Sequence, residues 1–122
     1  MTKAFLATVA VVIASTIAHA EDDAVRGEQR FTDCAACHSL MPGANNIGPS
    51  LAGLFGRKAG TTADFRYSPA MRQSKITWTP QLLDEFIADP QKLVPANRMP
   101  YSGMPNAADR ADLVAYLQKA TK

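Results

Sequence analysis

The chain has 122 residues, of which 47% are hydrophobic and 20% are charged, a composition typical of one small globular domain. The net charge at pH 7 is only +2, which argues against nucleic-acid binding because proteins with that function carry a strongly basic patch or stripe. The sequence contains no internal repeat and no low-complexity tract.

The first 20 residues have the pattern of a secretory leader. Lys3 precedes an apolar run over residues 4–17, and an Ala-His-Ala cleavage site ends at Ala20. The run has about 14 residues, fewer than the ~20 that a transmembrane helix requires. We therefore expect residues 1–20 to be cleaved, which leaves a single domain over residues 21–122. In a bacterium the exported protein would be periplasmic.

A helix is predicted over residues 24–36, with Val25, Phe31 and Ala35 near one face. Gly27 lies one turn before Phe31. Because a glycine inside a helix costs about 0.5–1 kcal/mol relative to alanine, it suggests that another backbone comes close at this point. A surface glycine without a special role is the alternative.

This helix leads into Cys34-Ala35-Ala36-Cys37-His38, a run typical of the covalent attachment of one c-type haem. Each thiol can bond one vinyl group of the porphyrin, and the adjacent histidine can bind the iron. A structural disulfide, a zinc site and a thioredoxin-like redox pair are the alternatives. Outside the leader the sequence has no further cysteine or histidine for zinc, and no strand pattern precedes Cys34 as a thioredoxin-like fold requires. The pattern therefore favours haem.

Residues 39–74 are rich in Gly, Pro and Asn and are predicted to form loops. So long an irregular segment is unusual in a small domain unless something else orders it, and a haem face would do so. Pro49 and Leu51 are candidates for the wall that fixes the ring of His38. Three side chains are candidates to bond the haem propionates, with an ordinary core position as the alternative for the aromatic ones: Arg57, Tyr67 and Trp78.

Helix starts recur in the second half of the chain. Thr79-Pro80 and Asp89-Pro90 each combine a capping residue with proline at the first helical position. Asn106, followed three residues later by an acidic side chain, resembles a capping box and opens the final helix. The sequence thus predicts an all-α fold of three main helices and loops.

Four methionines are candidates for the sixth ligand of a haem iron, since a thioether suits this metal. Met99 and Met104 lie between the last helices, whereas Met41 and Met71 are more remote. Prolines stiffen the chain on both sides of Met99, and Asn97 could bond a propionate or the backbone. The context favours Met99, with a methionine that fills a gap in the core as the alternative.

Taken together, the order and spacing of these segments resemble those of class I cytochromes c, in particular the small soluble bacterial relatives of the mitochondrial protein. The resemblance covers residues 27–120. The matching segments are Cys34-Ala35-Ala36-Cys37-His38, Gly48-Pro49-Ser50-Leu51, Leu54-Phe55-Gly56-Arg57-Lys58, Tyr67-Ser68, Ile76-Thr77-Trp78 and Asp112-Leu113-Val114-Ala115-Tyr116-Leu117.

The resemblance implies the class I cytochrome c fold around one covalent haem c, whose iron alternates between Fe²⁺ and Fe³⁺. It implies His38 and Met99 as axial ligands, because the family places its ligand at the position of Met99, whereas Met104 stands where an apolar packing residue is usual. It also implies that Gly27 and Phe31 cross Leu113 and Tyr116 where the terminal helices meet.

Around the haem, the resemblance implies that the Pro49 carbonyl accepts a hydrogen bond from the His38 ring. It also implies that Arg57, Tyr67 and Trp78 surround a propionate. Two positions depart from the family pattern: Phe86 replaces a common tyrosine near the axial methionine, and Met71 replaces a common asparagine. Since polarity around the ligands tunes a haem, the redox potential cannot be copied from the family.

The expected function is that of an electron carrier and not of an enzyme, because two axial ligands leave no position on the iron for a substrate. We expect a monomer that meets membrane redox complexes transiently: a quinol:cytochrome c oxidoreductase, a terminal oxidase or a photosynthetic reaction centre. No nucleic acid or small-molecule substrate is expected. The alternative is a small haem enzyme or gas sensor with a labile sixth ligand, which the absence of a second histidine for acid-base chemistry disfavours.

Overall fold

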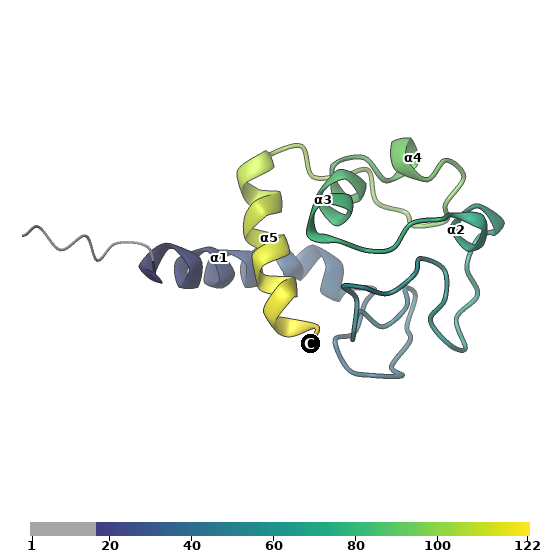
Figure 1. Cartoon of the computed structure of the whole chain (residues 1–122), viewed down its shortest axis with the longest axis horizontal. Coiled ribbons are helices and arrows are strands. Elements are labelled where there is room, and N and C mark those ends of the chain that lie inside the picture. The colour runs from purple at the N-terminus through teal and green to yellow at the C-terminus, as the bar shows by residue number, and fades with distance from the viewer. Residues whose placement is uncertain (1–16) are drawn as a thin grey trace, which may run out of the picture.

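The computed structural model describes residues 17–122, which fold into five helices joined by loops (Figure 1). In chain order these are α1 (Ile17–Ala35), α2 (Pro69–Gln73), α3 (Pro80–Ala88), α4 (Pro90–Leu93) and α5 (Ala107–Ala120). Within these residues the β pairing is limited to one isolated antiparallel bridge between Lys58 and Thr77. The described chain is all-α, as predicted.

Most of the predicted leader lies outside the described residues. Residues 1–16 are not described, and the expected cleavage point after Ala20 falls within α1, whose backbone is helical from Ile17. Among the helices of residues 17–122, none is both long enough and apolar enough to cross a membrane. Cleavage of the leader stays a prediction.

The two terminal helices cross each other and form the most extensive helix pair of the described chain (Figure 1). Gly27 permits this approach, because a Cβ atom built there would overlap the backbone carbonyl of Asp112. One turn later, the ring centroids of Phe31 and Tyr116 lie 5.5 Å apart, and Leu113 is fully buried. The predicted crossing is confirmed, and Gly27 is a contact residue rather than a surface glycine.

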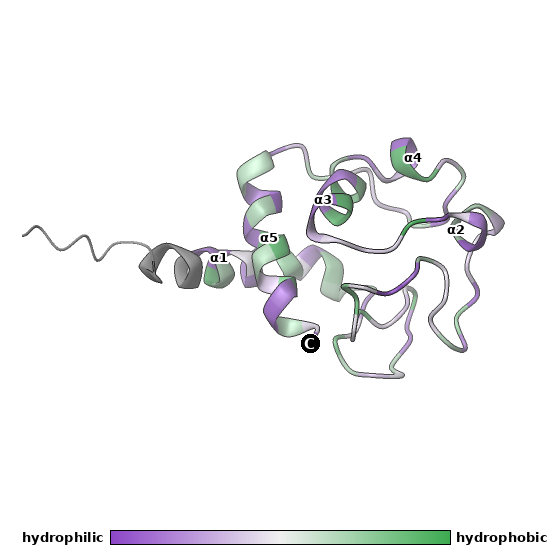
Figure 2. Cartoon of the chain, in the orientation of Figure 1, coloured by the Kyte–Doolittle hydropathy of each residue, from purple (hydrophilic) through white to green (hydrophobic). Residues whose placement is uncertain are grey.

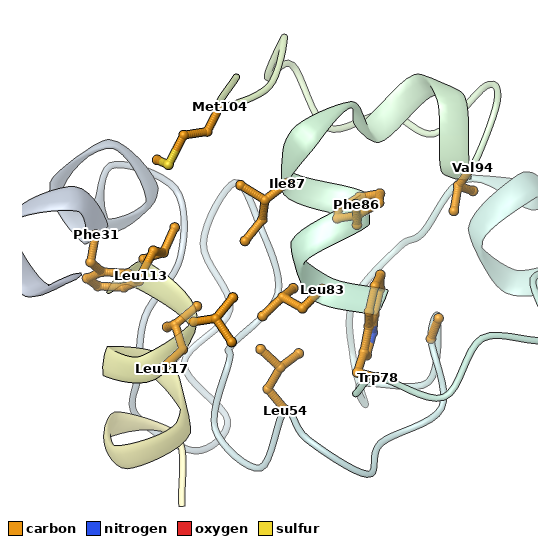
Figure 3. Close-up of a cluster of buried hydrophobic side chains, with 12 residues drawn as sticks. Phe31, Leu54, Trp78, Leu83, Phe86, Ile87, Val94, Met104, Leu113 and Leu117 are labelled. Atoms are coloured by element: carbon orange, nitrogen blue, oxygen red, sulfur yellow. The ribbon is translucent and has the colours of Figure 1, made fainter. Parts of the chain in front are cut away.

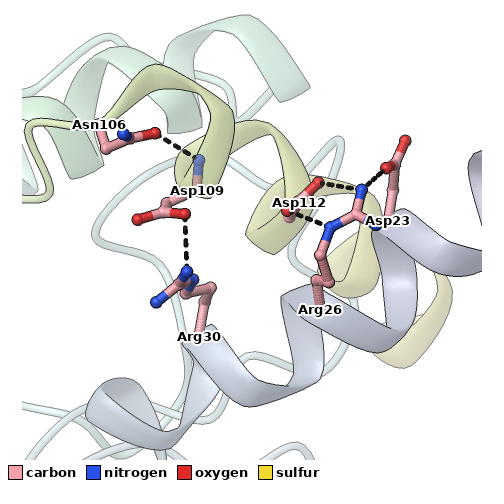
Figure 4. Close-up of polar contacts among 6 residues, drawn as sticks. All are labelled: Asp23, Arg26, Arg30, Asn106, Asp109 and Asp112. Carbon is pink, nitrogen blue, oxygen red and sulfur yellow. Dashed lines mark hydrogen bonds and ion pairs between the residues drawn. The ribbon is translucent and has the colours of Figure 1, made fainter.

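Ion pairs border the same crossing (Figure 4). Arg30 of α1 lies 2.9 Å from Asp109 of α5, and Arg26 lies 3.0 Å from Asp112. Arg26 also pairs with Asp23 within α1. Because exposed ion pairs contribute little free energy, apolar burial stabilises the crossing and the pairs mainly favour one alignment of the helices.

The predicted buried face of the first helix is wrong in two of its three positions. Val25 is 60% exposed, and Ala35 is exposed as well. The buried face contains Gly27 and Phe31, which meet α5, and the half-buried Cys34, which packs against the core. These residues are spaced four and then three apart and therefore share one side of a helix. The helix also begins at Ile17, seven positions before the predicted start.

Three predicted helix starts are confirmed, each by a side chain that accepts a hydrogen bond from the backbone N–H three residues later. These caps are Thr79, Asp89 and Asn106. The prediction of loops over residues 39–74 is wrong for α2, which Ser68 caps and Pro69 opens. The signal at α2 is the same capping residue followed by proline that predicts α3 and α4.

One hydrophobic core joins the helices to the loops (Figure 3). Its largest members are Phe31 of α1, Leu83, Phe86 and Ile87 of α3, Leu113 and Leu117 of α5, and Leu54, Trp78, Val94 and Met104 from the connecting segments. Along α5, bands of hydrophobic and hydrophilic residues follow one another (Figure 2). Its buried residues Leu113, Val114 and Leu117 are spaced so that they share one side of the helix. The core thus fixes α3 and α5 relative to the loops that form the site.

Candidate haem-binding site

A cavity of about 400 Å³ lies between the C-terminal end of α1, helix α3 and the loops, within the range of about 300–1,000 Å³ usual for small-molecule and cofactor sites. Its lining is mostly apolar. The eight residues favoured as haem-binding from the sequence and the family resemblance all line this one cavity: Cys34, Cys37, His38, Pro49, Arg57, Tyr67, Trp78 and Met99. The alternative ligands Met41 and Met104 are not among the lining residues. The fold therefore brings together side chains that are far apart in the sequence.

The two cysteines and His38 reach the cavity because the chain makes a tight turn where α1 ends. The backbone N–H groups of Cys37 and His38 both donate to the carbonyl oxygen of Cys34, at 3.0 and 2.9 Å. This turn satisfies a carbonyl at the helix end and directs three successive functional side chains to one side. The C-x-x-C-H run is thus presented as one unit.

Both cysteines are free thiols in this structure, so the disulfide considered from the sequence is not formed. Burial, helped by the charges of Asp33 and Cys37, raises the pKa of the Cys34 thiol to about 11. Since the thiolate is the species that takes part in disulfide exchange, the raised pKa favours the less reactive thiol form of Cys34.

The ring of His38 is held by the loop that faces it. Its Nδ1 atom lies 2.7 Å from the carbonyl oxygen of Pro49, as expected. Because a carbonyl only accepts, Nδ1 carries the proton and donates it, which leaves the lone pair of Nε2 free for a metal. Gly48 comes so close that a Cβ atom built there would lie 2.6 Å from Nδ1, so the backbone at Gly48 and Pro49 fixes the imidazole.

Polar side chains in turn hold this loop. Ser50, which is 2% exposed, donates from Oγ to the carbonyl of Met41 at 2.6 Å. Its backbone N–H donates to Oδ1 of Asn45 at 3.0 Å, and the Asn45 amide donates to the carbonyl of Ala63 at 2.9 Å. Hydrogen bonds between side chains and backbone therefore order this long irregular segment, which also forms part of the cavity wall.

Arg57 and Trp78 share one wall because their backbones pair. The N–H of Trp78 donates to the carbonyl of Arg57 at 2.9 Å. The Arg57 guanidinium donates to the carbonyls of Ala52 at 2.8 Å and Ser50 at 3.2 Å. Since a guanidinium has five N–H donors, these two bonds orient the group while other donors remain.

Tyr67 lines the cavity with its hydroxyl engaged as an acceptor. Its oxygen accepts a hydrogen bond from the backbone N–H of Thr62 at 3.2 Å, and its ring packs edge-on against Phe65 with centroids 4.8 Å apart. The hydroxyl proton is thereby left to donate to another group. Among the described residues, the Oγ1 atom of Thr62 itself is buried without a hydrogen-bond partner.

The two methionines near the last helix have different surroundings. Met99 is partly buried and lines the cavity. Met104 is 8% exposed and belongs to the hydrophobic core (Figure 3), where its N–H donates to the carbonyl of Ile87 at 2.8 Å. Met71 and Phe86, the two departures from the family pattern, also line the cavity, so they make that part of its wall apolar.

Comparison with known proteins gives consistent matches over most of the chain. The family model for cytochrome c matches residues 24–121. Cytochrome c2 of Blastochloris viridis is 44% identical over 110 residues, which cover 89% of this chain and 87% of that relative. Cytochrome c of Chlamydomonas reinhardtii is 44% identical over 110 residues, covering 88% and 98%. Cytochrome c2 iso-2 of Magnetospirillum fulvum is 47% identical over 88 residues, covering 72% and 92%.

The chain belongs to the cytochrome c family. As a cytochrome c it carries covalently attached haem c with its iron, and it is a haem-based electron-transfer protein. Members of this family are electron carriers and not enzymes, which agrees at the family level with the non-enzymatic function expected from the sequence.

The residues of this cytochrome c fit the cofactor. The cavity offers two free thiols from one turn, an imidazole whose Nδ1 bonds the Pro49 carbonyl so that Nε2 is the atom left for a metal, and a thioether. This donor set suits haem iron and two vinyl groups, and no described group of three or more His, Cys, Asp or Glu residues forms a competing site for a metal ion. The apolar lining suits a porphyrin body.

Sequence inspection missed several residues that shape the site. Gly48 stands in the sequence analysis only within the segment Gly48-Pro49-Ser50-Leu51, yet it sets the distance between this loop and the imidazole. Asn45 and Ser50 order the loop, and Gln91 bonds the segment before Met99. Because these contacts join polar residues to distant backbone atoms, no local pattern in the sequence marks them.

Proposed function

We propose that this protein is a periplasmic one-electron carrier in which Cys34 and Cys37 form the thioether bonds to haem c, while His38 and Met99 are the axial ligands. The observation that carries the proposal is that the four side chains line a single cavity. Support for His38 comes from its Nδ1–H bond to Pro49, which leaves Nε2 as the donor to iron.

The bound haem supplies an iron that accepts and releases one electron between its ferric and ferrous forms. His38 and Met99 would both bind this iron, so that neither a substrate nor dioxygen would find an open position on it. The Pro49 carbonyl holds the ring of His38, and the cavity that would hold the haem has a mostly apolar lining. Two protein donors to the iron favour a carrier over a haem enzyme or a gas sensor.

Arg57, Tyr67 and Trp78 are proposed to hold the haem propionates. The guanidinium of Arg57 is already oriented by two backbone carbonyls and retains free donors. The Tyr67 hydroxyl accepts from Thr62 and so keeps its proton for a carboxylate. Charged and hydroxyl donors bind carboxylates strongly when they are held in advance.

Replacing Met99 tests the ligand assignment. The Met99→Ala variant should lose the sulfur-to-ferric-iron charge-transfer band and bind carbon monoxide in the reduced state, because it lacks the thioether. Met104→Ala is the matched control and should keep the band, since Met104 lies in the core. Retention of the band in Met99→Ala together with its loss in Met104→Ala would transfer the ligand role to Met104.

The proposed partners are membrane redox complexes, met as transient encounters by a monomer. Ile47, 72% exposed, lines the cavity together with the exposed Arg66 and Arg98. A small apolar contact with few surrounding cations favours fast and weak association. Electron-transfer rates with an acidic partner should therefore fall only modestly as salt increases, and a steep fall would contradict this view.

A further inference from the structure

The segment that carries Met99 folds back onto α4 and is held there by two amide side chains. Asn97 is 7% exposed and lines the cavity with Met99. Its Nδ2 donates to the carbonyl of Pro90 at 3.0 Å and to that of Val94 at 2.9 Å. Its Oδ1 accepts from the backbone N–H of Met99 at 2.9 Å. One side chain thus joins both ends of α4 to the methionine.

Gln91 holds the same segment from the exposed side. Its Nε2 donates to the carbonyl of Asn97 at 3.0 Å, and its Oε1 accepts from the N–H of Ala96 at 3.1 Å. Ala96 has a φ angle of +67°, a left-handed conformation that is strained for a residue with a Cβ. The reciprocal bonds to Gln91 compensate for this strain and keep the turn closed.

These contacts explain why an amide stands at position 97. Two carbonyl oxygens on one side, those of Pro90 and Val94, each accept an amide proton of Asn97 in addition to a backbone N–H, whereas the Met99 N–H on the other side needs an acceptor. Among side chains of this size only asparagine offers two donors together with an acceptor. Both amide protons are taken by α4 carbonyls, so Asn97 bonds the backbone and keeps no proton for a haem carboxylate.

We infer that Asn97 and Gln91 are positioning residues, a two-amide clamp that fixes the Met99 backbone and thereby keeps the thioether directed into the cavity. The inference rests on the proposed function, in which Met99 is an axial ligand. The clamp resists loss of the sulfur, because opening the segment around Met99 requires the buried amide of Asn97 to give up three hydrogen bonds together.

Asn97→Asp tests the clamp, since aspartate keeps the acceptor for Met99 but loses both donors and places a negative charge against two carbonyls. Asn106→Asp is the matched control. At the start of α5, Asn106 uses only its acceptor, toward the N–H of Asp109 at 3.0 Å, and aspartate caps helices equally well. Gln91→Ala is a milder second variant, because Gln91 is exposed and its loss does not endanger folding.

Two readouts are measured on the ferric haem protein: hydrogen exchange of the Met99 amide by NMR, and the affinity for added imidazole as a competing ligand. In Asn97→Asp we expect the exchange rate of the Met99 amide and the affinity of the ferric protein for imidazole each to rise by about tenfold or more. Gln91→Ala should change both in the same direction by a smaller factor, and Asn106→Asp should change neither.

The outcomes separate the clamp from the ligand assignment. If Asn97→Asp and Gln91→Ala both behave like Asn106→Asp, the clamp is refuted while Met99 can still be the ligand. If Met99→Ala keeps the charge-transfer band, the ligand assignment is refuted whatever the amide exchange shows. Should Asn97→Asp fail to fold, Gln91→Ala decides: unchanged exchange and imidazole affinity there overturn the inference.

Discussion

The crossing of α1 and α5 and the loop over residues 39–68 are stabilised in different ways. At the crossing, apolar side chains such as Phe31 and Leu113 bury one another directly, and the helices supply their own backbone hydrogen bonds. The loop has no helix or strand. It is held by polar contacts such as those of Ser50, while its apolar residues Leu51 and Leu54 line the cavity.

This difference means that the two regions depend unequally on the cofactor. The crossing is a contact between two helices of the same chain, and all of its partners are present without haem. The cavity side of the loop gains its apolar partner only when haem is bound, and small domains have little core to spare. Ligand binding to the folded state alone adds stability by mass action, so the loop should be the region that haem attachment stabilises most.

The largest expected effect comes from preventing haem attachment. The exported wild-type protein should have the intact mass of residues 21–122 plus one haem, whereas a Cys34→Ser, Cys37→Ser variant should lack haem. We expect that variant to lose its cooperative thermal transition. The loss then equals the whole free energy of unfolding of a small domain, about 5–15 kcal/mol. Circular dichroism and amide exchange measure the loss.

Which amides lose their protection in this variant tests whether the loop depends on haem more than the crossing of α1 and α5 does. Amides of the loop should lose all protection, and any residual protection should be confined to α1 and α5. A haem-free variant whose loop amides stay as protected as those of the terminal helices would show that the loop needs no cofactor. Retention of residues 1–20 in the exported wild type would refute the predicted cleavage.

A substitution at the crossing should have the second-largest effect. In Gly27→Ala the new Cβ meets the Asp112 carbonyl, so the helices must separate, and we expect a loss of about 2–4 kcal/mol in the free energy of unfolding. Gly43→Ala is the control, because Gly43 has a φ of +72° and open space around it; backbone strain alone should cost about 1 kcal/mol. Urea denaturation measures both, and equal losses would contradict the close contact.

The sequence was more informative about helices than about the site walls. Caps at Thr79, Asp89 and Asn106 are local signals and predicted three helix starts. The start of α2 at Ser68 carries the same signal, but Gly and Pro dominate the neighbouring residues and predict a loop there. The predicted buried face of α1 is wrong at Val25, because among the described side chains of this helix Phe31 is the one large apolar residue that is buried.

The candidate site was predictable for a different reason. The C-x-x-C-H run is specific by itself, whereas the other members are candidates with open alternatives until the resemblance to a family selects among them. The structure places them in one cavity. The roles of Arg57 and Tyr67 toward haem stay predictions. Contacts such as that of Gln91 with Ala96 depend on how the chain folds back in three dimensions, so composition and periodicity do not predict them.

The smallest expected effect concerns the ion pairs at the crossing, and it asks whether charge or apolar packing holds the terminal helices. Arg30 and Asp109 lie 2.9 Å apart, but their side chains are 49% and 30% exposed. At such exposure the pair should contribute only about 0.2–1 kcal/mol, because water and salt screen it.

A double-mutant cycle of Arg30→Ala and Asp109→Ala, followed by urea denaturation, measures the coupling free energy. The cycle is needed because Asp109 lies in the first turn of α5, where its charge also interacts favourably with the helix dipole; that contribution cancels in the coupling. The coupling should shrink further in about 1 M salt, where the screening length falls to about 3 Å. A coupling above about 2 kcal/mol that persists in salt would mean that Arg30 and Asp109 are desolvated partners and that charge, more than the contact of Gly27 and Phe31 with α5, sets the crossing.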